Sequence, residues 1–176
     1  MVDLITVRMK PIYYIDGNNL LHFWDKTGYL IKKGQYRQAQ KILIEKIKHS
    51  PLMRKSSFEI FFDGEVPSYS FATGPAKVKL TFCYPDTADS RIEEKLRLNY
   101  QRNLSIIVVS NDHEVQKSAR RYDFKSISNL EFIEKIEAFE HKKKYSDEEG
   151  VKTEIHEKDI EKWLKIFEKG NNEEVD

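Results

Sequence analysis

The stretch that decides the fold is Tyr13-Tyr14-Ile15-Asp16-Gly17-Asn18-Asn19-Leu20-Leu21. An apolar run that begins at Ile12 predicts a buried strand, and the run ends on the carboxylate of Asp16. Gly17 and two asparagines then lead into a short apolar segment. An α/β protein places an acid in this way at the carboxyl end of a parallel strand, where ligands usually bind. On this stretch alone a second interpretation is equally open, in which Asp16 only caps the following helix.

Apolar and alternating segments predict five strands, and the segments between several of them have helical spacing. Strands are expected at 12–15, 58–62, 78–84, 104–109 and 124–127. Helices are expected at 35–49, 88–101, 113–122 and 128–139, and 18–24 is expected to be a short helix or a turn. The Gly- and Pro-containing segments 27–34 and 65–76 are expected to be loops. This order predicts an α/β fold in which a mostly parallel sheet carries helices on both faces.

The 176-residue length is typical of one domain, expected here at residues 11–140 after an N-terminal leader at 1–10. Residues 141–150 are charged and are expected to form a linker, the first part of a C-terminal segment at 141–176. In that segment, apolar residues at helical spacing predict an amphipathic helix at 155–167. We expect this helix to pack on the domain, with docking on a partner as the alternative.

Composition excludes several classes of protein. The net charge is +1, with a mildly basic chain through residue 140 and an acidic segment after it, which is compatible with a nucleic-acid partner. The single cysteine, Cys83, excludes an internal disulfide and a Cys-rich zinc site. No stretch is long and apolar enough to span a membrane, and Met1 to Lys10 lack the layout of a signal peptide. A soluble cytoplasmic protein is therefore expected.

Acidic side chains follow three of the predicted strands. Asp16, Asp63 and Asp112 follow strands, and Asp89 and Glu93 are four residues apart on one face of a helix. Because the carboxyl ends of parallel strands meet at one edge of a sheet, these carboxylates are expected to converge and to raise one another's pKa. A divalent cation would relieve the repulsion, and Mg²⁺ prefers oxygen ligands. The metal-ligand candidates are Asp16, Asp89 and Asp112, with Glu93 as a further ligand or an outer base.

Polar residues around these acids are candidates for substrate binding. Asn18 or Asn19 could orient water or phosphate, and Arg91 is the cation chosen for phosphate contact. Ser110 could hydrogen-bond a ligand carboxylate or satisfy the backbone. Simpler structural roles stay open for turn, capping and surface residues: Asp63, Asp86, Asp112, His22 and His113.

Four motifs in this order resemble a known family: Asp16-Gly17-Asn18-Asn19, Phe61-Phe62-Asp63-Gly64, Thr87-Ala88-Asp89-Ser90-Arg91-Ile92-Glu93 and Val108-Val109-Ser110-Asn111-Asp112-His113-Glu114-Val115-Gln116. Together they resemble the YacP-like NYN domain, a branch of the PIN-like nuclease superfamily, over roughly residues 11–140. Where that family has a glycine after the last of these motifs, this chain has Asp123.

The resemblance implies a three-layer α/β/α PIN-like fold and a ribonuclease that depends on Mg²⁺ or Mn²⁺. Its acids correspond to Asp16, Asp89 and Asp112, with Glu93 as the following acid. Characterised relatives include a ribosome-associated endonuclease that cuts mRNA, so the implied partner is RNA, with mRNA at the ribosome as the specific case. The alternatives are a non-catalytic RNA- or ribosome-binding module and a small-molecule phosphohydrolase. The latter is disfavoured because Asn18 stands where that chemistry usually has a second aspartate.

Overall fold

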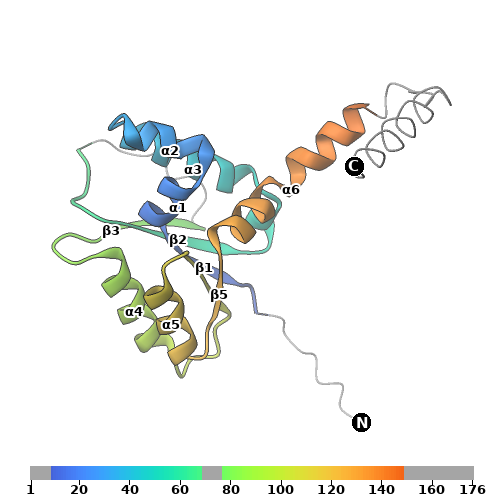
Figure 1. Cartoon of the computed structure of the whole chain (residues 1–176). Helices are drawn as coiled ribbons and strands as arrows, with labels where there is room; N and C mark the ends of the chain where they lie inside the picture. Colours follow the sequence, from blue (N-terminus) through green and yellow to red (C-terminus); the bar gives the residue numbers. More distant parts are fainter. Residues whose placement is uncertain (1–8, 69–76, 149–176) are drawn as a thin grey trace, which may run out of the picture. The chain divides into compact units, whose positions relative to one another are not determined.

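The computed structural model describes residues 9–68 and 77–148 of the chain. In these residues five parallel strands form one sheet in the order β3-β2-β1-β4-β5 (Figure 1). The strands are β1 (Ile12–Asp16), β2 (Ser57–Phe62), β3 (Val78–Phe82), β4 (Ile106–Val109) and β5 (Lys125–Ile127). The five expected strands are confirmed, and the sheet is parallel throughout.

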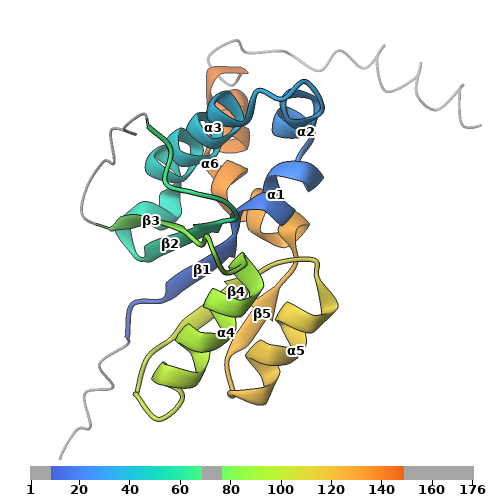
Figure 2. The same cartoon turned by 90° about the vertical axis from the view of Figure 1, so that its left-hand side faces the viewer.

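Helices cover both faces of the sheet (Figure 2). They are α1 (Gly17–Phe23), α2 (Asp25–Lys32), α3 (Tyr36–His49), α4 (Ala88–Asn99), α5 (His113–Arg121) and α6 (Asn129–Glu148), with a short 3₁₀ turn η1 (Pro51–Arg54). One core lies between the sheet and the group α1, α2, α3 and the first turns of α6. A second core lies between the sheet and the pair α4 and α5. The expected three-layer α/β/α arrangement is confirmed.

The alternation of side chains along β1 explains why both faces are covered. Tyr13 and Ile15 belong to the first core, and Tyr14 belongs to the second. All three are buried, as expected of the central strand of a parallel sheet with helices on each side.

The loop expected at residues 27–34 is wrong, because most of it is helix α2. Thr27 is completely buried, and its hydroxyl donates to the carbonyl oxygens of Leu21 (2.7 Å) and Trp24 (3.1 Å). Leu30 and Ile31 are buried in the first core. Tertiary burial thus outweighs the weak helix propensity of Thr27 and Gly28, and the helix stops before Gly34, whose φ is +72°.

Helix α6 is longer than expected. It continues through Glu148, so most of the charged segment assigned to a linker is helical. The segment has no Gly or Pro before Gly150, and its Lys and Glu residues are good helix formers. The chain divides into two units, Met1–Phe139 and Glu140–Asp176, and the functional division between the expected domains stays a prediction. Most of the leader, residues 69–76 of the loop and the helix expected at 155–167 lie outside the described residues.

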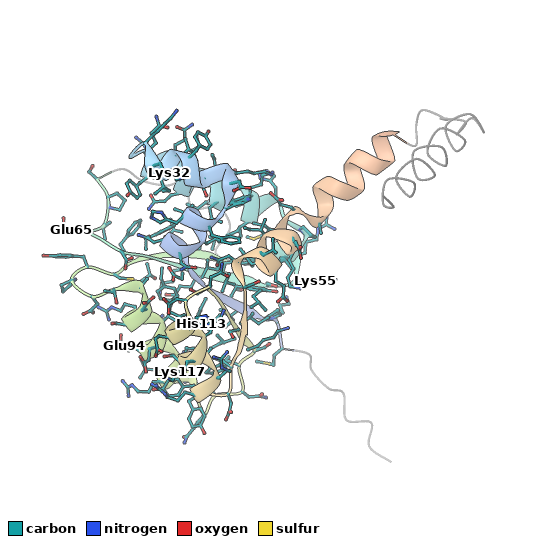
Figure 3. The ribbon with its side chains drawn as sticks, in the orientation of Figure 1. Lys32, Lys55, Glu65, Glu94, His113 and Lys117 are labelled. Carbon is teal, nitrogen blue, oxygen red and sulfur yellow. The ribbon has the colours of Figure 1, made fainter. Side chains whose placement is uncertain are left out.

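The register of the sheet sets up the candidate site. Central strand β1 lies between β2 and β4, and Ile15 pairs with Val109 while Asp16 pairs with Phe61. The residues that follow all three strands therefore lie at one edge, which we call the carboxyl edge. In Figure 3, Lys55, which precedes β2, and Glu65, which follows it, mark the two opposite ends of the strands. Among the described residues, no helix has the length and apolarity needed to cross a bilayer.

Candidate active site

Asp16 is the buried acid at the centre of the carboxyl edge, with only 5% of its surface exposed. One carboxylate oxygen, Oδ1, accepts a hydrogen bond from the backbone N–H of Asn19 (3.1 Å) and thereby caps helix α1. The other, Oδ2, accepts from the hydroxyl of Ser110 (3.0 Å), which follows the neighbouring strand β4. Asp16 therefore caps helix α1 with one oxygen, and Ser110, which follows β4, holds the other oxygen by a hydrogen bond.

The environment of Asp16 disfavours its charge. Burial raises the pKa of Asp16 to about 6, although the hydrogen bonds from Asn19 and Ser110 work in the opposite direction. The negative charges of Asp89 and Asp63 raise the pKa further. Acids from three separate segments therefore influence one another electrostatically, as expected of the carboxyl edge.

Asp89 lies in the first turn of α4, and Asp63 follows β2. Desolvation raises the pKa of Asp89, and the charges of Asp112 and Asp63 raise it further. Asp63 accepts a hydrogen bond from the backbone N–H of Ala88 (2.8 Å), so it anchors the start of α4 to the end of β2. The hydroxyl of Thr87 caps the same helix by accepting from the N–H of Ser90 (3.3 Å). Asp63 thus has a structural role in addition to its electrostatic effect.

Asp112 caps helix α5, since its Oδ1 accepts from the backbone N–H groups of Glu114 (2.7 Å) and Val115 (3.3 Å). The hydroxyl of Ser110 accepts from the N–H of Asp112 (3.0 Å) while donating to Asp16. Ser110, which is fully buried, therefore connects two of the three predicted metal ligands.

No described Lys or Arg side chain forms an ion pair with Asp16, Asp63, Asp89 or Asp112. Glu59 shows the contrasting case, because it is almost as buried as Asp16, at 7% exposed. Burial alone would raise its pKa, but hydrogen bonds from Lys79 and Thr81 and the charge of Lys95 lower it overall. The Lys79 and Lys95 ammonium groups lie 3.0 and 3.2 Å from its carboxylate. Within the part of the chain that the structure describes, a buried structural carboxylate is thus neutralised by two ammonium groups, whereas Asp16, Asp63, Asp89 and Asp112 have no such partners.

These acids fit a hard divalent cation in part. Oxygen donors whose negative charges raise one another's pKa, with no described cation paired to them, are suited to Mg²⁺ or Mn²⁺. Within residues 9–68 and 77–148, however, no group of three His, Cys, Asp or Glu side chains is close enough to form a metal site. The donor set therefore fits an ion held by one or two carboxylates and water, the usual arrangement for Mg²⁺.

The remaining predicted site residues are Asn18, Glu93 and Arg91, and two of them form ion pairs with neighbouring side chains. Asn18 is half-buried in the first turn of α1. Glu93 pairs with Arg121 of α5 at 2.6 Å. Arg91 pairs with Asp86 (3.0 Å) and Glu94 (2.9 Å). The charges of Glu93 and Arg91 are thus already balanced by neighbours.

Sequence reasoning missed three polar residues behind the acids. Gln116 donates its side-chain N–H to the carbonyl of Ser110 (2.8 Å). Asn111 and Asn129 form hydrogen bonds with Asn19. Gln116 and Asn111 lie within the last quoted motif, so their spacing was a usable signal, whereas no sequence pattern marks Asn129.

Comparison with protein families gives a match over residues 13–170 to the model described as "YacP-like NYN domain". This match covers most of the chain. The chain belongs to the YacP-like NYN domain family. Members of this family are PIN-like nucleases, and the resemblance drawn from the four motifs is confirmed. No curated protein sequence matches the chain.

Solved structures of one YacP-like protein share the fold. The crystal structure of Rae1 (YacP) from Bacillus subtilis has a TM-score of 0.64 and 23% identity, covering 90% of this chain and 92% of that one. The structure of a single-residue mutant of the same protein has a TM-score of 0.62 and 20% identity, covering 81% and 84%. At these identities the likeness establishes the fold alone. The chemistry of this YacP-like chain has to be inferred from its own residues.

Proposed function

We propose that this protein is a divalent-metal-dependent endoribonuclease that hydrolyses RNA phosphodiester bonds at the carboxyl edge. The observation that carries the proposal is the electrostatic coupling of Asp16 and Asp89, whose pKa values rise through burial and through the charge of neighbouring acids. Membership of a PIN-like nuclease family supports the same conclusion.

Asp16 and Asp89 are the residues that would hold the ion, with Asp112 as a further ligand or a ligand to bound water. When bound there, Mg²⁺ or Mn²⁺ would polarise the phosphodiester and lower the pKa of the attacking water. Ser110 keeps Asp16 oriented by its hydrogen bond to Oδ2. Each oxygen of a carboxylate has two lone pairs, so Asp16 and Asp112 can cap their helices and still offer an oxygen to a ligand.

The remaining predicted residues have supporting roles in this proposal. Asn18 lies in the first turn of α1, beside Asp16, where it would contact a phosphate or a water. A phosphate could replace one of the two carboxylates that pair with Arg91, since a bidentate guanidinium contact suits phosphate. Glu93 could act as an outer base only after it separates from Arg121.

The test is RNA cleavage by the full chain with Mn²⁺, with Mg²⁺, and with a chelator. We expect 5′-phosphate and 3′-hydroxyl products in the presence of metal only, because water would form the new bond to phosphorus while the bond to the ribose 3′-oxygen breaks and that oxygen leaves with a proton. Asp16→Asn and Asp89→Asn should each lower the rate by at least 100-fold, since each removes a charged ligand. Glu45→Gln is the control, because it removes an acid of α3 that pairs with Lys48, outside the proposed site, and should change the rate little.

A second arm places the same RNA, as mRNA, on ribosomes. Cleavage that occurs only there would support the ribosome context. Cleavage that persists after both Asp16→Asn and Asp89→Asn would contradict the proposed site. Binding of RNA without cleavage in every condition would instead favour a non-catalytic binding module.

A further inference from the structure

Three asparagines from three separate segments meet behind the acids of the carboxyl edge. Asn19 lies in α1, Asn111 follows β4, and Asn129 begins α6. The side-chain oxygen of Asn19 accepts from the backbone N–H of Asn111 (2.9 Å) and from the side-chain N–H of Asn129 (2.7 Å). The side-chain oxygen of Asn111 accepts from the backbone N–H of Asn129 (2.9 Å). We call these three residues the asparagine clamp.

The asparagine clamp is connected to two of the predicted metal ligands. Asn19 donates its own backbone N–H to Oδ1 of Asp16, and Asn111 immediately precedes Asp112. A hydrogen bond from the Asn129 side chain therefore acts on the first turn of α1, which Asp16 caps. A second, from the Asn129 backbone, acts on the segment that carries Asp112. Hydrogen bonds made by a residue behind a ligand commonly orient that ligand.

Asn129 is also the residue with an unsatisfied polar atom. It is fully buried, and its side-chain oxygen has no hydrogen-bond donor among the described residues. The backbone N–H of Asn111 donates to Asn19 Oδ1, which identifies that atom as the amide oxygen. The orientation of the Asn129 amide follows, because a flipped amide would bring two oxygens together. A buried acceptor without a donor is unfavourable, and a leucine of similar size would avoid it. The chain thus tolerates an unfavourable atom at the position that supplies a side-chain donor to Asn19.

We propose that Asn129 is a positioning residue of the candidate active site, which acts through Asn19 to hold the start of α1, capped by Asp16, against the segment that carries Asp112. The inference rests on the proposed function, because a positioning effect has meaning only if these acids bind an ion and RNA. It assigns to the start of α6 a role in a site that is otherwise built from the ends of β1 and β4 and the first turn of α4.

The first experiment measures Mn²⁺ affinity of the full chain by isothermal titration calorimetry, without RNA. Asn129→Leu should weaken Mn²⁺ binding by about 10- to 100-fold, the range typical of lost outer hydrogen bonds at metal sites. Its thermal midpoint should stay close to that of the unmodified chain, because the substitution removes the unsatisfied oxygen together with the donor. In RNA cleavage by Asn129→Leu, the fold decrease in kcat should be larger than the fold increase in KM.

Asn99→Leu is the matched control. Asn99 is also buried and donates its side-chain N–H to the carbonyl of Lys95 (2.7 Å), but it lies at the far end of α4. We expect this variant to lower the thermal midpoint and to leave Mn²⁺ affinity unchanged. An effect on Mn²⁺ binding as large as that of Asn129→Leu would mean that loss of any buried asparagine is enough, and would overturn the inference.

A double-mutant cycle that combines Asn129→Leu with Asn19→Ala tests whether Asn129 acts through Asn19. If Asn129 acts through Asn19, the double variant should bind Mn²⁺ no more weakly than Asn19→Ala alone. Additive losses, or unchanged Mn²⁺ affinity in Asn129→Leu, would overturn the inference while the unmodified chain remains an active nuclease. If the unmodified chain neither binds Mn²⁺ nor cleaves RNA, the proposed function fails and the inference fails with it. Should Asn129→Leu not fold, Asn129→Ser is measured in its place.

Discussion

Asp16 combines two requirements that conflict at the level of a single residue. A helix cap needs an oxygen at this position, and asparagine or serine would supply one without a buried charge. The carboxylate is instead retained although burial raises its pKa to about 6. A charge that is unfavourable for folding and is not needed for capping is typical of a functional residue.

Asp16→Asn should therefore increase stability while it abolishes activity. The amide oxygen keeps the cap to the Asn19 N–H, and the substitution removes the buried charge. At neutral pH we expect a gain in the free energy of unfolding of roughly 1–3 kcal/mol, since one unit of pKa shift corresponds to about 1.4 kcal/mol. Urea denaturation measures the gain and RNA cleavage measures the loss. A less stable variant that keeps full activity would contradict the assignment.

The pH dependence of this difference has a definite sign. Because the folded-state pKa of Asp16 is raised above its ordinary value of 3.8 to about 6, the folded protein binds the proton more tightly than the unfolded chain. The stabilisation from protonated Asp16 is complete below the unfolded value and is lost as the pH rises through about 6. The stability advantage of Asp16→Asn over the unmodified chain should thus be small near pH 4 and largest above pH 7. An advantage that does not change with pH would exclude a raised pKa for Asp16.

At the level of elements, the turn from β1 into α1 needs a residue without a side chain. A Cβ atom on Gly17 would lie 2.8 Å from the carbonyl oxygen of Phe61 and would also contact the ring of Phe62. Gly17→Ala should therefore destabilise the protein by about 1–3 kcal/mol through overpacking against β2. Urea denaturation measures this effect. The control is Gly34→Asn, which has open space around it and a left-handed φ that asparagine tolerates; equal stability losses in both would argue against the close approach.

The end of α5 offers a second test at this level. Asp123 lies just after the C-cap of α5, and its φ of +58° is left-handed. Helices commonly end on such a residue, and glycine adopts this conformation without strain. Asp123→Gly should raise the thermal midpoint by a few degrees, which corresponds to about 1 kcal/mol, without changing RNA cleavage. A lower midpoint would mean that the aspartate side chain makes a compensating interaction.

For the molecule as a whole, local patterns predicted most of the fold. Continuous apolar runs such as 104–109 indicated strands covered on both faces, and their order indicated a parallel sheet. The α2 helix was missed because Thr27 and Gly28 are poor helix formers, and the contacts that stabilise the helix come from distant residues. The acids of the carboxyl edge were predictable because each follows a recognisable strand or helix start. Asn129 was not, because its partner Asn19 is 110 positions away and one asparagine carries no periodic signal.

The proposed function requires that one divalent cation is bound by both Asp16 and Asp89. The most direct measurement is anomalous X-ray diffraction from crystals of the full chain soaked in Mn²⁺. We predict an anomalous peak within coordination distance of carboxylate oxygens of Asp16 and Asp89, and its loss in crystals of Asp89→Asn. A well-occupied Mn²⁺ that contacts neither acid, or a peak that persists unchanged in Asp89→Asn, would contradict the account.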